Sequence, residues 1–285
     1  MNGVKNICPS GTYGINDGQE YCLTCTEGFY CGEGTILPKE CGDSSKFCPS
    51  GSILPQTVSP GYYSIGSSIT TKRTGQVIAP RGHYARNGEL FKCTGTFGSR
   101  EGLDHPNCDG PCSAGFFCPA GSTEFKQYPC NKPNKFCPEG SKSPFDVDDG
   151  FYTTDIKDVN QTAIQEGEYE HQKVNGRQFE CEIGYWCKMG IRYPCPRGSY
   201  GNKSRETNPL CAGKCSQGYW CGQASTSPAQ NNCGGPKFYC PEGSAHPKGV
   251  YDGYYTDVEE SVENKSSVEP CPPGEHLQRF WPYLF

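Results

Sequence analysis

The fold is decided by the sequence CSQGYWC at residues 215–221, in which two cysteines lie six residues apart around a glycine and an aromatic pair. A near copy, CEIGYWC, occupies residues 181–187. Working outward from residues 215–221, we find a block of six cysteines with successive separations of 16, 4, 6, 12 and 7 residues. Two earlier blocks have separations of 14, 3, 6, 10 and 7 and of 15, 4, 6, 12 and 7 residues. This periodicity predicts a tandem repeat of one small unit.

The three blocks contain 18 of the 21 cysteines. In chain order they are Cys8, Cys22, Cys25, Cys31, Cys41 and Cys48; Cys93, Cys108, Cys112, Cys118, Cys130 and Cys137; and Cys195, Cys211, Cys215, Cys221, Cys233 and Cys240. Most blocks begin and end on a Cys-Pro-x-Gly sequence, in which Pro at the second position and Gly at the fourth favour a β-turn. We therefore predict a tandem array of short β-hairpin cysteine-rich units, with almost no helix, that forms an elongated rod.

The composition indicates a small disulfide-rich fold. The 285 residues include 37 Gly and 24 Pro, and Leu, Ile, Val and Phe together stay below about 20%, a level at which a conventional core is rare. Disorder is disfavoured, because 12% of the residues are aromatic and the net charge is only -5. Disulfides then substitute for buried area, which predicts an oxidising compartment and an extracellular or cell-surface location.

Charge and hydropathy argue against two kinds of partner. Lys and Arg are scattered except for Lys72-Arg73, so there is no basic stripe to neutralise the phosphates of a nucleic acid. No run of 18 apolar residues suits a membrane span. The expected partners are other copies of the chain, assembled head to tail or laterally, or other extracellular proteins.

Three cysteines remain outside the blocks. Cys181 and Cys187 precede Cys195 by 14 and 8 residues, and the same distances before Cys93 lead to Ala79 and Ala85. Both cysteines are replaced together, as expected of two that bond to each other, so we predict a Cys181–Cys187 disulfide. Cys271 corresponds to Cys181 in the repeat, but Leu277 occupies the position that corresponds to Cys187. Cys271 is therefore predicted to be unpaired or to have a partner outside this chain.

The repeat divides the chain into four segments: a first unit with its linker at 1–78, a second at 79–180, a third at 181–270, and a divergent tail or the start of a further unit at 271–285. The second linker is longer by 13 residues, because Gln76 lies 13 residues after Tyr63 whereas Gln178 lies 26 after Tyr152. Both ends cut the repeat, and the first eight residues contain no apolar stretch suited to a signal peptide, so a signal has been removed or the chain is an excerpt. We expect a stretch of a longer array, with Phe280, Trp281 and Phe285 as junction elements.

The sequence is compatible with more than one disulfide connectivity. Six cysteines allow 15 pairings. Local closure at residues 181–187 favours sequential pairing of first with second, third with fourth and fifth with sixth cysteines. In the main competitor the third pairs with the fifth and the fourth with the sixth. Each loop contributes about 2 to 3 kcal/mol to the free energy of unfolding in the chain-entropy model.

The order Cys-Pro-x-Gly-Thr-Tyr, a 14-residue step, a closely spaced cysteine pair and then Gly-aromatic-aromatic-Cys resembles the ephrin-receptor-like cysteine-rich repeats. These are similar to the modules of tumour-necrosis-factor receptors and growth-factor receptors. The resemblance covers all three blocks and extends to large extracellular repeat proteins of algae and other protists, including flagellar-hair components. It implies the pairs Cys8–Cys22, Cys93–Cys108 and Cys195–Cys211, and it favours crossing of the remaining four cysteines in each block.

Metal binding and catalysis have weak signals. The Cys22–Cys25 spacing is half of a zinc site, but no second half follows. The acidic runs 146–149 and 257–260 lack the alternating ligands of a calcium loop. The five histidines, His83, His105, His171, His246 and His276, do not recur at matching repeat positions. We therefore expect no enzyme and no cofactor, and we expect the Gly-aromatic elements to cover disulfides rather than to bind sugars.

Three Asn-x-Ser/Thr triplets predict N-linked glycans at Asn160, Asn202 and Asn264. Together with the repeat, they favour a structural role as a subunit or spacer of an extracellular filament, surface fibre or matrix. The alternative is a receptor-like ectodomain that binds a protein ligand through a non-repeating face, for which the insertion around residues 165–173 is the candidate. An inhibitor or hydrolase accessory domain has no sequence feature in its favour.

Overall fold

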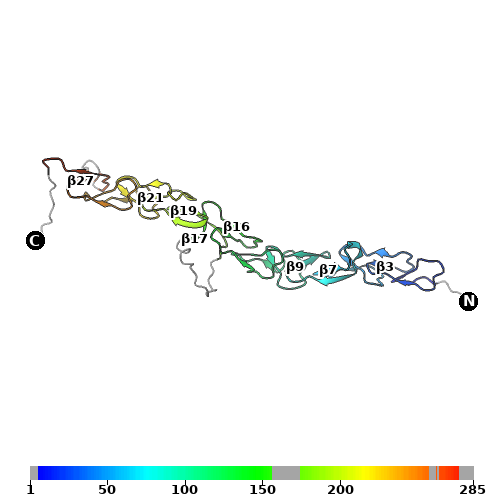
Figure 1. Cartoon of the computed structure of the whole chain (residues 1–285). Coiled ribbons are helices and arrows are strands. Elements are labelled where there is room, and N and C mark those ends of the chain that lie inside the picture. Colours follow the sequence, from blue (N-terminus) through cyan, green and yellow to red (C-terminus); the bar gives the residue numbers. More distant parts are fainter. Residues whose placement is uncertain (1–5, 156–173, 257–260, 262, 276–285) are drawn as a thin grey trace. The chain divides into compact units, whose positions relative to one another are not determined.

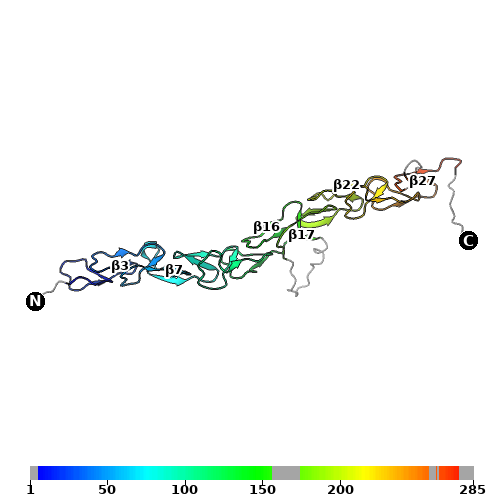
Figure 2. The same cartoon turned by 180° about the vertical axis from the view of Figure 1, so that it is seen from behind.

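A computed structural model describes residues 6–155, 174–256, 261 and 263–275. The chain forms two compact units. The first comprises Met1–Cys130 and Cys137–Pro144, and the second comprises Asn131–Phe136 and Phe145–Phe285. Within each unit the strands succeed one another in chain order, as both views show (Figure 1 and Figure 2).

The first unit contains β1 (Thr12–Tyr13), β2 (Leu23–Thr24), β3 (Phe29–Tyr30), β4 (Lys39–Glu40), β5 (Lys46–Phe47), β6 (Gln56–Thr57), β7 (Tyr62–Ile65), β8 (Gly75–Ile78), β9 (His83–Arg86), β10 (Glu89–Lys92), β11 (Thr96–Phe97), β12 (Gly110–Pro111), β13 (Phe116–Phe117) and β14 (Tyr128–Pro129). The second contains β15 (Lys135–Phe136), β16 (Phe145–Asp146), β17 (Phe151–Asp155), β18 (Phe179–Glu180), β19 (Tyr185–Lys188), β20 (Gly190–Pro194), β21 (Ser199–Tyr200), β22 (Gly213–Lys214), β23 (Tyr219–Trp220), β24 (Asn231–Asn232), β25 (Phe238–Tyr239), β26 (Lys248–Gly249), β27 (Tyr254–Thr256) and β28 (Val268–Pro270).

Each odd-numbered strand pairs antiparallel with the strand that follows it in the chain. The larger sheet, in the order β18-β17-β20-β19, joins two such hairpins through parallel pairing of β17 with β20. Helical structure in the described part of the chain is limited to the 3-10 turn Thr70–Lys72, and none of the helical segments there is long and apolar enough to cross a membrane. The prediction of a disulfide-rich β-hairpin fold with almost no helix is confirmed.

The buried interior consists mainly of cystine. The largest side chains that are fully buried are all cysteines, and the other buried hydrophobic side chains of the described residues are Phe47, Ala79, Ala85 and Leu103. Large aliphatic side chains lie mostly outside, as shown by Leu37, which is 73% exposed. Sulfur therefore fills the space that Leu, Ile and Val fill in larger domains, which accounts for the scarcity of those residues.

Nine of the ten disulfides follow the sequential pairing within the blocks, and the tenth is the predicted Cys181–Cys187 bond. They join Cys8 to Cys22, Cys25 to Cys31, Cys41 to Cys48, Cys93 to Cys108, Cys112 to Cys118, Cys130 to Cys137, Cys181 to Cys187, Cys195 to Cys211, Cys215 to Cys221 and Cys233 to Cys240. The crossed arrangement that the receptor modules imply is absent from these ten pairs. Cys271 has a free thiol, and its partner position Leu277 lies outside the described residues.

Candidate functional site

The feature that recurs along the described chain is the junction between one hairpin and the next. In the second unit, the amide of Gly198 donates to the carbonyl of Cys221 at 2.9 Å, that of Gly201 donates to Ser225 at 2.9 Å, and that of Ala224 donates back to Cys195 at 3.0 Å. The corresponding bonds in the first unit run from Gly95 to Cys118, from Gly98 to Ser122 and from Gly121 to Cys93. The same three backbone bonds therefore join β11–β12 to β13–β14 and β21–β22 to β23–β24.

Glycine at the turn before most hairpins permits a second contact, which is made with the second hairpin further along the chain. Gly198 has a φ of 82°, and a Cβ built on it would lie 2.4 Å from the carbonyl oxygen of Gly243. Gly82 has a φ of 77°, and its Cβ would lie 2.3 Å from the oxygen of Gly121. Any side chain at these positions would force neighbouring backbone segments apart. Much of the glycine content is thus explained by close approach of hairpins.

One position decides which disulfide a hairpin forms. We define two positions around the turn that precedes a hairpin. The opening position is the residue just before the turn, for example Cys215. The third position is the third residue after the glycine of that turn, for example Cys221 after Gly218. Where both are cysteine, they bond to each other. In β21–β22 the third position is Gly201, whose Cβ would lie 2.7 Å from the Sγ of Cys195, and Cys195 bonds instead to Cys211 near the start of β22.

The hairpin after each block replaces this disulfide with a buried hydroxyl. Its third position is Ser64, Thr153 or Thr256, which are 4%, 6% and 6% exposed. The Oγ of Ser64 donates to the carbonyl of Ser44 at 2.7 Å, Thr153 donates to Pro133, and Thr256 donates to Pro236 at 3.3 Å. The three acceptors occupy the same position in the preceding hairpin. Sequence comparison missed these residues, although Ser or Thr stands where the blocks have Cys.

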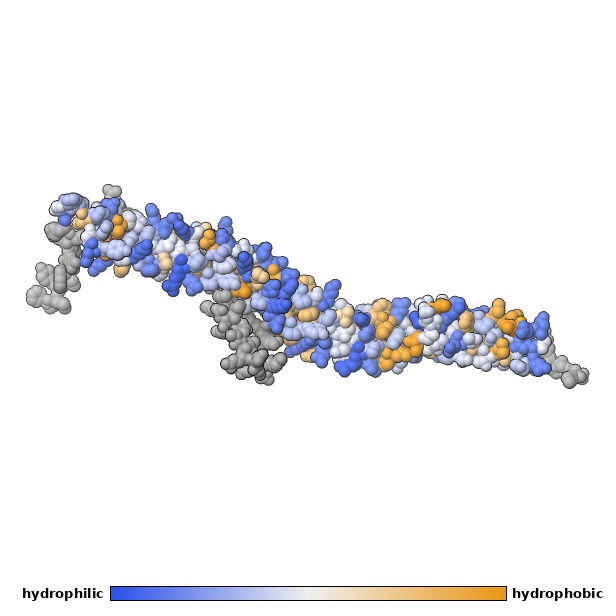
Figure 3. Space-filling view, viewed as in Figure 1, coloured by the Kyte–Doolittle hydropathy of each residue, from blue (hydrophilic) through white to orange (hydrophobic). Residues whose placement is uncertain are grey.

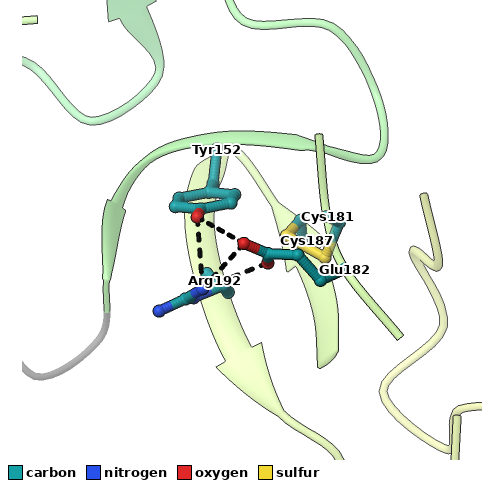
Figure 4. A network of polar contacts seen from close by, with 5 residues as sticks. All are labelled: Tyr152, Cys181, Glu182, Cys187 and Arg192. Atoms are coloured by element: carbon teal, nitrogen blue, oxygen red, sulfur yellow. Dashed lines mark hydrogen bonds and ion pairs between the residues drawn. A yellow bond between two sulfur atoms is a disulfide. The ribbon is translucent and has the colours of Figure 1, made fainter. Parts of the chain in front are cut away.

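A polar network lies at the junction of β17 with β19–β20 (Figure 4). Tyr152 Oη donates to a carboxylate oxygen of Glu182 at 2.9 Å, and an Nη of Arg192 lies 3.0 Å from the same oxygen. The Arg192 guanidinium lies 4.8 Å from the ring centre of Tyr152 and 4.6 Å from that of Tyr185. These contacts attach the linker hairpin to the hairpin that carries the Cys181–Cys187 disulfide.

The network controls the ionisation of Glu182. Partial burial opposes the charged form of this carboxyl group, but its own backbone amide, the guanidinium of Arg192 and the hydroxyl of Tyr152 all favour the charge. Together the three outweigh the burial and lower the pKa of Glu182 below its ordinary value. Glu182 is thus held as a carboxylate partner for Arg192 at neutral pH.

The aromatic residues form pairs across the hairpins. Trp186 stacks on Tyr193 with ring centres 4.4 Å apart, Tyr84 stacks on Phe91 at 5.2 Å, and Phe117 stacks on Tyr128 at 5.5 Å. Stacked ring pairs of this kind stabilise short hairpins that bury few other apolar side chains. Coverage of disulfides by these rings remains a prediction.

The candidate metal ligands in the described residues take part in other contacts. Cys22 and Cys25 belong to two different disulfides. Asp146 forms an ion pair with Lys135, and Asp148 accepts a hydrogen bond from Gln178. The acidic run 257–260 lies outside the described residues, and the rest of the described chain contains no group of three His, Cys, Asp or Glu placed to hold a metal ion.

The predicted glycosylation sites and junction elements differ in exposure and in whether they lie in the described residues. Asn202 is exposed, and Asn264 is half-buried against Tyr219. Asn160, the insertion around residues 165–173 and the elements Phe280, Trp281 and Phe285 lie outside the described residues. No protein-family model matches the chain, and no curated protein matches it either.

Proposed function

We propose that this chain is a stretch of an extracellular array that acts as a spacer or subunit of a filament, surface fibre or matrix. The observation that carries the proposal is that all ten disulfides close within single hairpins, whereas the same backbone hydrogen bonds join successive hairpins. In such an array each hairpin is stable locally, and length is added by repetition. Disulfides in this number are stable in an oxidising compartment.

The proposed kinship with ephrin-receptor-like repeats is supported by the organisation into short hairpins, of which those in the three blocks each hold a cystine. The proposed role is mechanical and needs neither a catalytic group nor a cofactor. Its chemistry is covalent closure of short loops, which limits how far each hairpin can extend under load.

The proposal is tested by electron microscopy of the purified chain and of a tandem duplication of it. We expect elongated particles whose length doubles on duplication, because each added hairpin meets its neighbour through the same bonds. Compact particles, or a duplicated chain no longer than the single one, would refute the spacer role.

The second candidate, a receptor-like ectodomain, is favoured by one observation. The loop tips of β3–β4 and β5–β6 carry Ile36-Leu37 and Ile53-Leu54, and Leu37 and Leu54 are 73% and 65% exposed. The same tips in the third block carry Thr226-Ser227 and Ala245-His246. In Figure 3, hydrophobic colour lies over the N-terminal hairpins of the first unit and also farther along that unit. Neighbouring exposed apolar residues at two loop tips of one block are typical of a binding surface.

The internal repeat supplies the variant that separates the two candidates. Replacing Ile36-Leu37 with Thr-Ser and Ile53-Leu54 with Ala-His copies the third block. If the protein is a receptor ectodomain, these changes abolish capture of a soluble partner from the extracellular medium and leave particle length unchanged. If it is a spacer, neither property changes.

A further inference from the structure

Two of the Asn-x-Ser triplets lie in the described part of the chain, and their asparagines are in opposite environments. Asn264 precedes β28 in the last linker, and Asn202 follows β21 in the first loop of the third block. N-linked glycosylation joins a sugar to the side-chain nitrogen Nδ2, so the surroundings of that atom decide which triplet is compatible with the fold.

The side chain of Asn264 is part of a hairpin junction. Its Nδ2 donates to the Tyr219 hydroxyl at 3.1 Å, and its Oδ1 is buried. Its carbonyl oxygen lies 2.7 Å from the position that a Cβ of Gly218 would take, and its backbone forms a bridge with Gly234. A sugar on Nδ2 would therefore have to displace the Tyr219 hydroxyl from the junction.

The first linker shows that this position has a structural role. Lys72 stands where Asn264 stands, since its carbonyl lies 2.8 Å from a Cβ built on Gly28. The ammonium group of Lys72 lies 5.2 Å from the ring centre of Phe29, the counterpart of Tyr219. In both linkers, this side chain contacts the ring that follows the turn glycine two hairpins earlier.

Asn202 is exposed, and its side chain makes no hydrogen bond within the described chain. The loop is nevertheless anchored on both sides, because the amide of Gly201 donates to Ser225 and that of Arg205 donates to Cys181. Comparison with the second block shows why the side chain of Asn202 has no hydrogen-bond partner. There, Ser99 occupies the position of Asn202, and both its amide and its hydroxyl bond to Asp109 at 2.7 Å.

The residue that corresponds to Asp109 in the third block is Ala212. The aspartate that ties down the loop is thus missing where the asparagine appears. Together, these observations distinguish Asn202 from Asn264 by exposure, by hydrogen bonding and by the register of the repeat.

We propose that Asn202 carries an N-linked glycan in the folded protein and that Asn264 remains unmodified, an inference that rests on the proposed extracellular role. In the transfer, a bond forms between Nδ2 and C1 of the first sugar of a lipid diphosphate oligosaccharide. The C1–phosphate bond breaks, Nδ2 loses one proton, and the lipid diphosphate leaves. The anchored loop then holds the glycan outside the hairpin array.

The test is secretion of the full chain, with Asn160→Gln, from a eukaryotic cell that glycosylates its secreted proteins. Material with ten disulfides is digested, treated with a glycosidase in ¹⁸O water and mapped by mass spectrometry. We expect the ¹⁸O label at residue 202 and an unlabelled peptide at residue 264. Ser204→Ala should lower the intact mass by the mass of one glycan. The matched change Ser266→Ala should lower it only by the difference between Ser and Ala.

A label at residue 264 in the folded protein, or an unlabelled residue 202, would overturn the inference. The spacer role is tested separately by particle length, so failure of one is distinguishable from failure of the other. A second readout is stability, because Asn264→Gln should lower the melting temperature and Asn202→Gln should not. Equal melting temperatures for these two variants would contradict the structural role of Asn264.

Discussion

The two complete linkers, residues 58–92 in the first unit and 147–194 in the second, are built on one plan but are held in different ways. In the first, the parallel pairing is a single bridge between Tyr63 of β7 and Gly88, the residue before β10. A groove of about 760 Å³ lies there, lined in part by Arg73, Leu90 and Phe91. In the second, β17 and β20 pair in parallel from Tyr152 to Asp155, and the Cys181–Cys187 disulfide closes the next hairpin.

The difference follows from a few substitutions at matching positions of the repeat. Ala79 and Ala85 replace the cysteine pair, and both are buried at 0% and 1% exposure. Leu90 stands where Arg192 stands, and Pro80 stands where Glu182 stands. Disulfide, ion pair and cation–π contacts are thus all present in the second linker and all absent at the same positions of the first. We therefore expect the two linkers to differ in stiffness although both retain their hairpins.

The largest effect is expected from converting the second linker to the first. Cys181→Ala with Cys187→Ala should cost about 2 kcal/mol of local stability, because a six-residue loop is no longer closed in the unfolded state. Hydrogen exchange of the amides in residues 181–194 should then become roughly thirtyfold faster. The matched control is Ala79→Gly, which removes only a methyl group. Unchanged exchange in the double variant would show that the disulfide does not hold the linker.

The reverse change should stiffen the first linker. Ala79→Cys with Ala85→Cys is expected to form a disulfide, because both alanines occupy the opening and third positions that pair elsewhere. The gain should approach about 2 kcal/mol and should disappear on reduction. Hydrogen exchange of the amides in residues 79–92 measures this gain in stability. Two free thiols after oxidative folding would contradict the assignment of Ala79 and Ala85 to these two positions.

A smaller effect is expected from the buried hydroxyls. Ser64→Ala leaves the carbonyl of Ser44 without its donor and should cost about 1 kcal/mol. Thr153→Val should act in the same way in the second linker, where the disulfide of the neighbouring hairpin limits the loss of structure. Ser216→Ala, at an exposed position, is the control for denaturant unfolding, and equal midpoints for Ser64→Ala and Ser216→Ala would refute the role of the hydroxyl.

The smallest effect concerns pH. Since the pKa of Glu182 is lowered in the folded chain, its contribution to stability is present above the unfolded pKa of about 4.3 and is lost as the pH falls through the folded value. Glu182→Gln should therefore lower the melting temperature at pH 7 and converge with the unmodified protein near pH 2. The first linker has Pro80 at this position and should show no such dependence at this junction. A difference in melting temperature between the two proteins that does not change with pH would contradict a stabilising ion pair between Glu182 and Arg192.

Sequence register alone predicts much of the fold and less of the candidate site. The cysteine separations indicate hairpins, and the joint replacement at Ala79 and Ala85 indicates local closure, because bonded partners are lost together. The contacts of Arg192 and Asn264 could not be predicted, since each reaches a ring in another hairpin and the distance along the chain, 40 residues from Tyr152 to Arg192, carries no signal. The hydroxyls at Ser64 and Thr153 are readable once the third position is known.

The central claim, that loops closed within single hairpins limit extension of the array, is tested most directly by pulling one chain from both ends with and without a reductant. The ten disulfides remove about 90 residues from the extensible path, so reduction should lengthen the fully stretched chain by roughly 250 Å. In oxidised protein, the first linker should yield at lower force than the second. The same stretched length before and after reduction would contradict the account.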